Sequence, residues 1–368
     1  MKIIHVITDL KQGGAQKILY KIITENNSDS EHIIISLIGS GHYKEILEQL
    51  EIRFYTLGMS NKSLNLKKLW KIYKILRLEK PDTVQTWMYH CDLIGGVIAR
   101  IAGIKNIFWG VVSFNLSADV MKLTSRIIIK INAALSYIIP SKIIYCAKSS
   151  IKVHEDIGFD KQKSIFIPIG FDVKHSLNKM YNKKENTTFT IGCIARWDPQ
   201  KDHHNLLKAL KILDDNQISY KCILASIGMD NTNPELISLI EKVGVDKNKL
   251  ELRGYVRDIN SLINKLDLNI LASAGEAFPN IIGETMSLGV LSIGTKVGDI
   301  PQIIGNNGWV IDKSDSKLLA KTIIQAKKEF MNKDKWRQKC FEARERIEKN
   351  YPVKKMIDEY YSIWRIIN

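Results

Sequence analysis

Residues 268–284 read LNILASAGEAFPNIIGE, and they combine a strand, a loop and the start of a helix. The apolar run from Leu268 to Ala272 is typical of a strand buried in a sheet. Small residues follow the run, and Pro279 can open a helix because the first helical position needs no N–H donor. The stretch is therefore a β-loop-α unit. Its loop lies at the carboxyl end of the strand, where open α/β sheets bind ligands.

The same alternation of short Ile- and Val-rich runs with amphipathic stretches continues in both directions along the chain. It predicts an α/β fold of parallel sheets with helices on both faces. The strands predicted in the first half are Ile3–Ile7, His32–Leu37, Arg53–Leu57, Thr83–Thr86, Ile107–Val111, Lys142–Cys146 and Ser164–Ile167. Those predicted in the second half are Phe189–Ala195, Lys221–Ser226, Leu250–Leu252, Leu268–Ala272, Val290–Ile293 and Trp309–Ile311.

The chain has 368 residues, which predicts two domains of roughly 150–200 residues each. A polar stretch over residues 174–188 separates the two series of strands and is interpreted as a linker. We therefore expect one Rossmann-like domain over residues 1–173 and another over residues 189–351. A last helix over residues 352–368 carries Tyr360, Tyr361 and Trp364, whose rings need a surface to bury against. We expect it to cross back to the first domain.

Two carboxylates dominate the opening stretch, Glu276 in the loop and Glu284 in the helix, eight residues apart. Acceptor carboxylates can bind sugar hydroxyls. The start of the helix extends from Phe278 to Ile282. Apart from Pro279, which has no N–H, these residues offer backbone N–H groups to an anion such as a phosphate. Sugar hydroxyls and a phosphate together indicate a sugar nucleotide site.

A second charged group follows the strand that ends at Ala195. Arg196 leaves the strand end, and Lys201 lies at the entry of the next helix. Two cations that converge on one anion can neutralise a diphosphate without a metal. The alternative is a surface loop with solvated charges, and the two glutamates make that interpretation the weaker one.

Two further features lie at strand ends in the first half. Gly13 and Gly14 follow the first strand and allow a ligand to approach the backbone closely, although a tight turn explains adjacent glycines as well. His90 follows the strand Thr83–Thr86 and could donate to a sugar hydroxyl or to a developing phosphate charge, although a structural role is equally common. Both are candidate site residues.

Charge and cysteine content restrict the class of protein. Lys and Arg number 54 against 39 Asp and Glu, a net charge of +15, which attracts anionic membranes, nucleic acids and nucleotides alike. The five cysteines are scattered without metal-ligand spacing, as in a reducing compartment. The first apolar run is too short for a signal peptide, and no run reaches the roughly 18 residues of a spanning helix. We expect a cytoplasmic protein, which could also lie at the inner face of the cytoplasmic membrane because its surface is basic.

With these residues in view, the chain resembles the family-4 glycosyltransferases of the GT-B fold, particularly those of bacterial surface polysaccharides. The resemblance covers nearly the full length. It is carried by Glu276 to Glu284 with Phe278-Pro279-Asn280 between them, by Arg196 and Lys201, by Gly13-Gly14-Ala15-Gln16, and by residues 166–172, FIPIGFD. Departures from the family pattern are Ile169 in place of the common Asn, Ala277 in place of a frequent Gly, and the lack of an Arg in residues 111–115.

The resemblance implies two facing Rossmann-like domains with an interdomain cleft, in which the second domain holds the donor and the first lies on the acceptor side. By this analogy Glu284 binds the ribose diol, Glu276 contacts the donor hexose, and Arg196 and Lys201 hold the diphosphate. His90 and the loop of Gly13 and Gly14 would close from the other domain. The implied reaction is the retaining transfer of a hexose or N-acetylhexosamine, with a UDP-sugar favoured, to a lipid-linked oligosaccharide of a capsule or O-antigen. The sequence contains no Asp-x-Asp, and we expect no metal and no other cofactor.

Three other functions are compatible with parts of the pattern. A sugar nucleotide epimerase or hydrolase of the same fold would act on the donor alone. A non-catalytic nucleotide-sugar-binding protein would use a decayed site, which the intact glutamates and cations disfavour. A nucleic-acid binder rests on net charge alone, and the basic helices lack the aromatic interleaving or compact module expected of one.

Two basic amphipathic stretches occupy the first half. The first is residues 62–80, where one side carries Lys67, Lys68, Lys71 and Lys74 and the other carries Leu66, Leu69, Trp70, Tyr73 and Leu76. The second is residues 119–139, where one side carries Lys122, Arg126 and Lys130 and the other carries Leu123, Ile127, Ile131, Ala134 and Ile138. Ordinary surface helices are the favoured interpretation, with the apolar side inward and the cations in water. The lysines could also tether the protein to an anionic membrane, at about 1 kcal/mol each.

Overall fold

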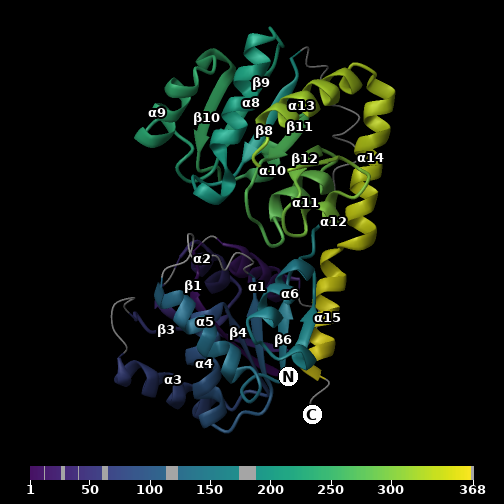
Figure 1. Cartoon of the computed structure of the whole chain (residues 1–368). Coiled ribbons are helices and arrows are strands. Elements are labelled where there is room, and N and C mark those ends of the chain that lie inside the picture. Colours follow the sequence, from purple (N-terminus) through teal and green to yellow (C-terminus); the bar gives the residue numbers. More distant parts are fainter. Residues whose placement is uncertain are drawn as a thin grey trace. The chain divides into compact units, whose positions relative to one another are not determined.

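The computed structural model describes residues 1–11, 13–25, 30–39, 41–59, 65–112, 123–173 and 188–365. The chain divides into two compact units (Figure 1). The first comprises Met1–Gly170 and the C-terminal segment from Val353, and the second comprises Phe171–Pro352. Apart from Thr188, the predicted linker lies outside the described residues. Each unit is built around one parallel sheet.

The first unit contains a seven-stranded sheet in the order β3-β2-β1-β4-β5-β6-β7. Its strands are β1 (Lys2–Asp9), β2 (Glu31–Gly39), β3 (Arg53–Thr56), β4 (Thr83–Trp87), β5 (Ile107–Val111), β6 (Lys142–Tyr145) and β7 (Ser164–Phe166). Its helices are α1 (Gly14–Thr24), α2 (His42–Gln49), α3 (Leu66–Glu79), α4 (Tyr89–Ile101), α5 (Leu123–Leu135), α6 (Lys148–Asp156), the single turn η1 (Lys161–Lys163) and α15 (Val353–Arg365). Strand order reverses between β1 and β4, so the carboxyl ends of these two strands flank the usual ligand position.

The second unit contains a six-stranded sheet in the order β10-β9-β8-β11-β12-β13. Its strands are β8 (Thr190–Ile194), β9 (Lys221–Ala225), β10 (Leu250–Gly254), β11 (Leu268–Leu271), β12 (Leu291–Thr295) and β13 (Trp309–Ile311). Its helices are η2 (Pro199–Lys201), α8 (His203–Asp215), α9 (Pro234–Val243), η3 (Lys247–Lys249), α10 (Ile259–Ile263), α11 (Asn280–Ser287), α12 (Ile300–Ile304), α13 (Ser316–Phe330) and α14 (Lys333–Asn350). Every predicted strand of both units is therefore present.

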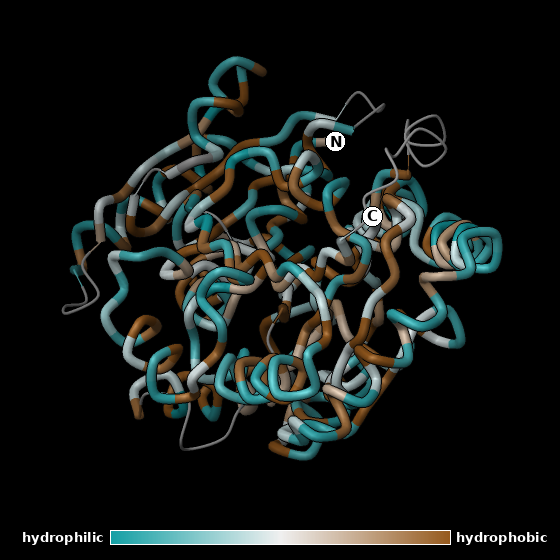
Figure 2. Tube along the Cα trace, turned by 90° about the horizontal axis from the view of Figure 1, so that it is seen from above, coloured by the Kyte–Doolittle hydropathy of each residue, from teal (hydrophilic) through white to brown (hydrophobic). Residues whose placement is uncertain are grey.

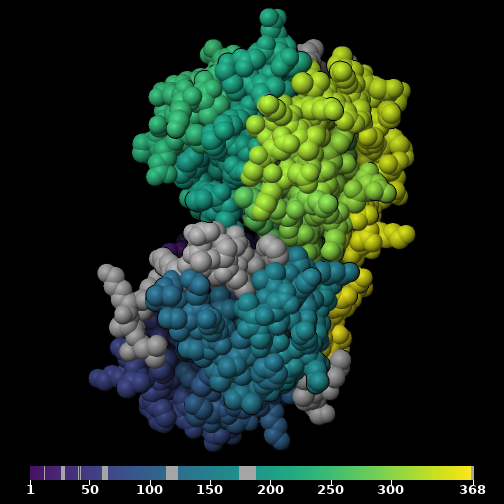
Figure 3. Space-filling view, viewed as in Figure 1, coloured from purple at the N-terminus to yellow at the C-terminus, as the bar shows by residue number. Residues whose placement is uncertain are grey.

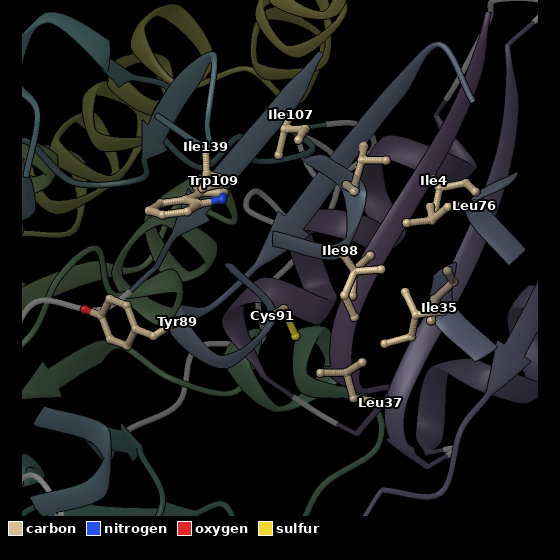
Figure 4. Close-up of a cluster of buried hydrophobic side chains, with 14 of the residues drawn as sticks. Ile4, Ile35, Leu37, Leu76, Tyr89, Cys91, Ile98, Ile107, Trp109 and Ile139 are labelled. Atoms are coloured by element: carbon tan, nitrogen blue, oxygen red, sulfur yellow. The ribbon is translucent and has the colours of Figure 1, made fainter. Parts of the chain in front are cut away.

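One large hydrophobic cluster of the first unit lies between its sheet and helices α3, α4 and α5 (Figure 4). Ile4 and Ile35 of the sheet, Leu76 of α3 and Ile98 of α4 contribute to it. Gly95 and Gly96 let α4 approach the sheet, because a Cβ on Gly96 would lie 2.6 Å from Trp109 Nε1. The two glycines thus allow α4 to pack closely on the sheet.

Helix α15 buries its aromatic side chains within the first unit. Trp364 is fully buried and donates its Nε1–H to Gln85 Oε1 at 3.1 Å. The hydroxyl of Tyr361 lies 2.7 Å from His32 Nε2, and His32 Nδ1 lies 2.9 Å from His5 Nε2. Burial lowers the pKa of His5 well below 6.5 and that of His32 to about 4, so both imidazoles are neutral at pH 7.

Phe171 joins the second unit rather than the first. Its backbone N–H donates to the carbonyl of Tyr351 at 2.8 Å, and its ring stacks on Phe278. Two residues further on, Val173 O accepts from Arg344 Nη2 at 2.8 Å. Residues 171–173, predicted as the end of the first domain, therefore pack with the second unit.

The outward faces of α3 and α5 differ from the prediction. Hydrophobic and hydrophilic residues both occur along the helical turns of the chain (Figure 2). Helix α5 buries Ile129, Asn132 and Ala133, while Leu123, Ile127 and Ile131 are exposed. Helix α3 buries Ile72, Ile75 and Leu76 and exposes Leu66 and Trp70. The expectation that the apolar sides named above face inward is wrong for these exposed residues. It holds for Leu76, and Leu69 and Tyr73 are partly buried against the same core. Residues 62–64 and 119–122, including Lys122, lie outside the described part of the chain.

Among the described residues, no helix is long and apolar enough to cross a membrane. Helices α4 and α5 contribute to the surface of the first unit seen in Figure 3.

Candidate functional site

Two loops of the second unit meet at the carboxyl ends of the strands of its sheet. Strands β8 and β11 are parallel neighbours, so the loops that follow them leave from the same edge. Arg196 and Lys201 follow β8, and Glu276 follows β11. The backbone joins these loops directly, because Ala274 N donates to Gln200 O at 2.8 Å.

Lys201 and Glu276 form an ion pair across the two loops. Lys201 Nζ lies 2.5 Å from Glu276 Oε1, and the two side chains are only 16% and 10% exposed. Ser273 Oγ donates to the same carboxylate oxygen at 2.6 Å. Charged groups this far from solvent need such partners. The pair is therefore a fixed arrangement of a cation and a carboxylate at a strand end.

Arg196 lies beside this pair and is bound to another carboxylate. Its Nε and Nη2 donate to Asp198 Oδ2 at 3.0 and 2.8 Å, and its side chain is 60% exposed. Burial alone would raise the pKa of Asp198. Hydrogen bonds from Gln200 N and Arg196, with the charges of Arg196 and Lys201, lower it below the ordinary value instead. Both cations thus act on Asp198, which occupies a position that an anionic ligand could take.

A glycine and an aspartate of a third loop fix the backbone of the Glu276 loop. Asp299 N donates to Ala277 O at 2.9 Å. Gly298 has φ +53°, and a Cβ there would lie 2.2 Å from the carbonyl oxygen of Glu276. Only glycine fits this contact without strain. The loop after β12 therefore shapes the site.

Helix α11 begins beside the Glu276 loop, with Pro279 as its N-cap. The ring of Phe278 is buried against Phe171 and Tyr351, so Phe278 can offer a ligand only its backbone. The backbone N–H of Ile282 donates to Pro279 O at 3.3 Å, so the expectation that it is free for an anion is wrong. This bond closes the first turn of the helix.

Asn280 and Glu284 lie one turn apart on α11 and share a side of the helix. Glu284 is half-buried, and Asn280 has a buried Oδ1 without a hydrogen-bond partner among the described residues. A buried acceptor of this kind calls for a donor. This side of α11 therefore offers a ligand two acceptors.

The remaining candidates belong to the first unit. Gly13 is the N-cap of α1, where a Cβ would collide with Gln16 Oε1, and Gly14 begins the helix. His90 is exposed in the first turn of α4, and partial burial of its ring lowers its pKa below 6.5. Thr8 Oγ1 lies 3.4 Å from Cys91 Sγ, so the end of β1 and the start of α4 are close together.

The backbone before His90 is strained. Met88 has φ +72°, a value that a side chain other than glycine rarely adopts, and its N–H donates to Gly110 O at 3.0 Å. Strain of this kind accumulates at functional positions. His90 lies two residues after this strained position, and its functional role stays a prediction.

The second unit also matches a known family. Residues 188–328 match the family model described as glycosyl transferases group 1. These residues form a glycosyl transferases group 1 domain. Arg196, Lys201, Glu276 and Glu284 all lie within the group 1 domain.

Two bacterial proteins are similar to most of the chain. One is the UDP-Gal:alpha-D-GlcNAc-diphosphoundecaprenol alpha-1,3-galactosyltransferase of Escherichia coli, 25% identical over 69% of this chain and 66% of that protein. The other is the capsular polysaccharide biosynthesis glycosyltransferase CapM of Staphylococcus aureus, 24% identical over 82% of this chain and 80% of CapM. Both matches extend beyond the group 1 domain.

The crystal structure of Anabaena HepE in complex with UDP and glucose has a similar fold. It covers 100% of both chains with a TM-score of 0.84 at 20% identity. HepE has also been solved in complex with UDP-glucose, with a TM-score of 0.82. The predicted GT-B fold of two Rossmann-like domains with parallel sheets is confirmed.

The sequence interpretation missed two residues of the site, Asp198 and Ser273. Asp198 precedes Pro199, and an Asp before a proline is a helix-start signal; here it caps η2. Ser273 is the first polar residue after the apolar run of β11. Both signals are present, although neither indicates that the side chains reach a cation and a carboxylate.

Proposed function

We propose that the protein is a retaining glycosyltransferase that moves a hexose or N-acetylhexosamine from a nucleotide diphosphate sugar, with a UDP-sugar favoured. The observation that carries this proposal is the partly buried pair of Lys201 and Glu276 beside Arg196 in the group 1 domain. One side of this arrangement is suited to a diphosphate and the other to sugar hydroxyls.

The diphosphate binds Arg196 in place of the Asp198 carboxylate. Arg196 is exposed enough to turn from Asp198 to a ligand, and its planar guanidinium suits two phosphate oxygens. Lys201 has three donors, so it can keep Glu276 and still reach the diphosphate. The backbone at the start of α11, from Phe278 to Ile281, adds the positive end of a helix dipole. Glu284 binds the ribose hydroxyls, and the free Oδ1 of Asn280 accepts from the same nucleotide.

The slow step of such a transfer is the departure of a nucleoside diphosphate that gains negative charge. Arg196 and Lys201 stabilise that charge as it develops, which is worth roughly 3–4 kcal/mol for a well-aimed donor. Because Lys201 also holds Glu276, it fixes that carboxylate against the hexose. A cation pair performs here the task that a metal ion performs elsewhere, so no metal is required.

His90, Gly13 and Gly14 remain candidates of the first unit. We propose that His90 donates a hydrogen bond to the reacting sugar and that the backbone of Gly13 and Gly14 contacts the donor. The strained turn before His90 and the glycine N-cap of α1 support these roles. The kinetics of His90→Ala test the first of them.

The acceptor is a growing lipid-linked glycan of a capsule or O-antigen, at the inner face of the cytoplasmic membrane. The activities of two relatives support this choice, since one galactosyltransferase acts on a diphosphoundecaprenol and CapM belongs to capsule biosynthesis.

A two-step experiment tests the proposal. Thermal unfolding is first measured with UDP, GDP, ADP and their sugars, and we expect one nucleotide to raise the melting temperature. The best donor is then incubated with lipid-diphosphate oligosaccharides, and the elongated product is identified by mass spectrometry. Nucleotide release or sugar isomerisation without transfer would instead identify a hydrolase or an epimerase. No shift with any nucleotide would contradict the proposal.

A further inference from the structure

Helix α5 presents an apolar stripe to solvent. Leu123 is 68% exposed, Ile127 50% and Ile131 41%, and Ile138 just beyond the helix is 66% exposed. The first three recur every four residues, so they lie on one side of the helix. The opposite side, with Ile129, Asn132 and Ala133, packs on the core. The stripe is therefore unpartnered within the described chain, although its residues could have filled a core.

The neighbouring helices continue this surface. Helix α4 contacts both α3 and α5, so the three helices lie side by side on one face of the sheet (Figure 1). Leu66, Trp70 and Leu78 of α3 are exposed, and so is Ile101 at the end of α4. We call the exposed side of α3, α4 and α5 the outer layer. All three helices thus expose apolar side chains, and exposed apolar surface of this kind can mark an interaction site.

Cations lie among these apolar side chains. Arg126 and Lys130 flank the stripe of α5 and are exposed. Helix α3 exposes Lys67, Lys71, Lys74 and Arg77. The ammonium of Lys74 lies 5.9 Å from the centroid of the Trp70 ring, which stacks on Tyr73. The outer layer thus alternates apolar and positively charged groups.

No acidic side chain balances these cations within residues 66–79 and 123–135. Helix α5 contains no Asp or Glu. The single acid of α3, Glu79, is buried and hydrogen-bonded to Tyr55, with Arg53 3.1 Å away. A second copy of this face would bring like charges together, which disfavours self-association. The chemistry that fits is a flat, anionic and partly apolar partner.

We propose that the outer layer docks on an anionic lipid bilayer, with Leu123, Ile127 and Ile131 inserted among the acyl chains and the cations on the headgroup phosphates. Amphipathic helices with Lys or Arg beside an apolar side lie in the interface in this way, and exposed Trp residues such as Trp70 favour the same depth. Insertion goes beyond the purely electrostatic tether that the lysines alone suggest. It does not rest on the proposed donor or acceptor.

Vesicle sedimentation of the full chain tests this docking. The vesicles are neutral phosphatidylcholine, or phosphatidylcholine with phosphatidylglycerol, at low and high salt. We expect binding to the anionic vesicles that falls with salt but persists in part, because insertion is not screened. Ile127→Ser with Ile131→Ser should lower the partition coefficient at least about tenfold at both salt concentrations.

Matched variants control for loss of apolar surface and of charge elsewhere. Leu50→Ser with Met331→Ser removes two exposed apolar side chains outside the outer layer and should bind like the wild type. Lys67→Gln with Lys71→Gln should weaken binding mainly at low salt, whereas Lys321→Gln with Lys328→Gln on α13 should change it less. If the Ile127 and Ile131 variant fails to fold by circular dichroism, Leu123→Ser with Ile138→Ser takes its place.

Three results would overturn the proposal. The first is equal binding to neutral and anionic vesicles, and the second is stripe variants that bind like the Leu50 and Met331 control. The third is a dimer in light scattering that Ile127→Ser with Ile131→Ser dissolves, since a second copy would then cover the stripe. The thermal shift with nucleotides is independent of all three, so failure of the docking leaves the transferase proposal standing.

Discussion

Both units contain a parallel sheet, but they differ in where their charged, polar and exposed apolar side chains lie. The second unit gathers charges at strand ends, where Lys201, Glu276, Arg196 and Asp198 lie within two connected loops. The first unit buries polar rings instead, with His5, His32 and His154 all shielded from water. It also holds eleven of the fourteen exposed large hydrophobic side chains among the described residues. The same architecture thus carries a charged site in one half and an apolar surface in the other, so function follows the loops and faces rather than the fold.

The largest effect should come from removing a cation of the second unit. Lys201→Ala or Arg196→Ala should lower kcat about a hundredfold or more, because the departing diphosphate loses a positioned donor. Turnover is measured at saturating donor. Lys208→Ala, an exposed lysine of α8, is the control and should keep full activity. Unchanged turnover in both cation variants would remove the charged site from the mechanism.

Replacing each of the two glutamates of the second unit should affect a different measurement, the transfer rate for one and the UDP affinity for the other. Glu276→Gln should lower transfer roughly tenfold or more and leave UDP affinity nearly intact, because its contact is with the sugar. Glu284→Gln should instead weaken UDP binding, because its contact is with the ribose. Calorimetric titration with UDP, beside the transfer rate, distinguishes the two roles. The opposite pattern would show that the roles are exchanged.

Acid should destabilise the first unit more than the second. In the first unit, burial lowers the pKa of His32 and His154 to about 4 and that of His5 well below 6.5, whereas in the described part of the second unit His203 alone has a pKa that burial lowers. A neutral buried histidine contributes stability above the unfolded pKa of 6.5 and loses it as pH falls toward 4. For His32 this amounts to about 3 kcal/mol.

Hydrogen exchange at pH 7.5 and pH 5 locates this loss. We expect β1, β2 and α15 to lose protection at pH 5 before β8 and β11 do. His32→Gln keeps a polar group but does not titrate, so it should reduce the pH dependence. Equal loss in both units would contradict the comparison.

A smaller effect should follow from crowding the helix layer of the first unit. Gly96→Ala places a methyl group 2.6 Å from Trp109 Nε1 and 3.2 Å from Ile139 Cγ2, so the free energy of unfolding should fall by about 1–3 kcal/mol. Gly39→Ala is the control, because a Cβ there has no neighbour within 4 Å. Urea unfolding monitored by circular dichroism measures both. A Gly96→Ala variant as stable as Gly39→Ala would show that α4 has room to shift.

The smallest effect should be that of a chelator. Transfer measured with and without EDTA should proceed at the same rate, because Arg196 and Lys201 supply the positive charge. A rate that collapses with EDTA and returns with Mg²⁺ would assign that charge to a metal.

The strands could be predicted from the sequence, but the side-chain contacts of the site and the packing side of α5 could not. Every predicted strand is present because Ile- and Val-rich runs bounded by polar loops have few alternatives in a parallel sheet. The partner of Glu276 could not be predicted, since the Lys201–Glu276 pair joins residues 75 apart in sequence. The outward side of α5 could not be predicted either. Its sequence is apolar on two sides, and periodicity alone does not tell which side packs.

The central claim is that the cations and carboxylates of the group 1 domain bind an activated sugar. A crystal structure of the protein with UDP tests it most directly. The account predicts the diphosphate within hydrogen-bonding distance of Arg196 and Lys201, with Asp198 displaced from Arg196 and the ribose at Glu284. A diphosphate bound elsewhere, with Arg196 still on Asp198, would contradict it.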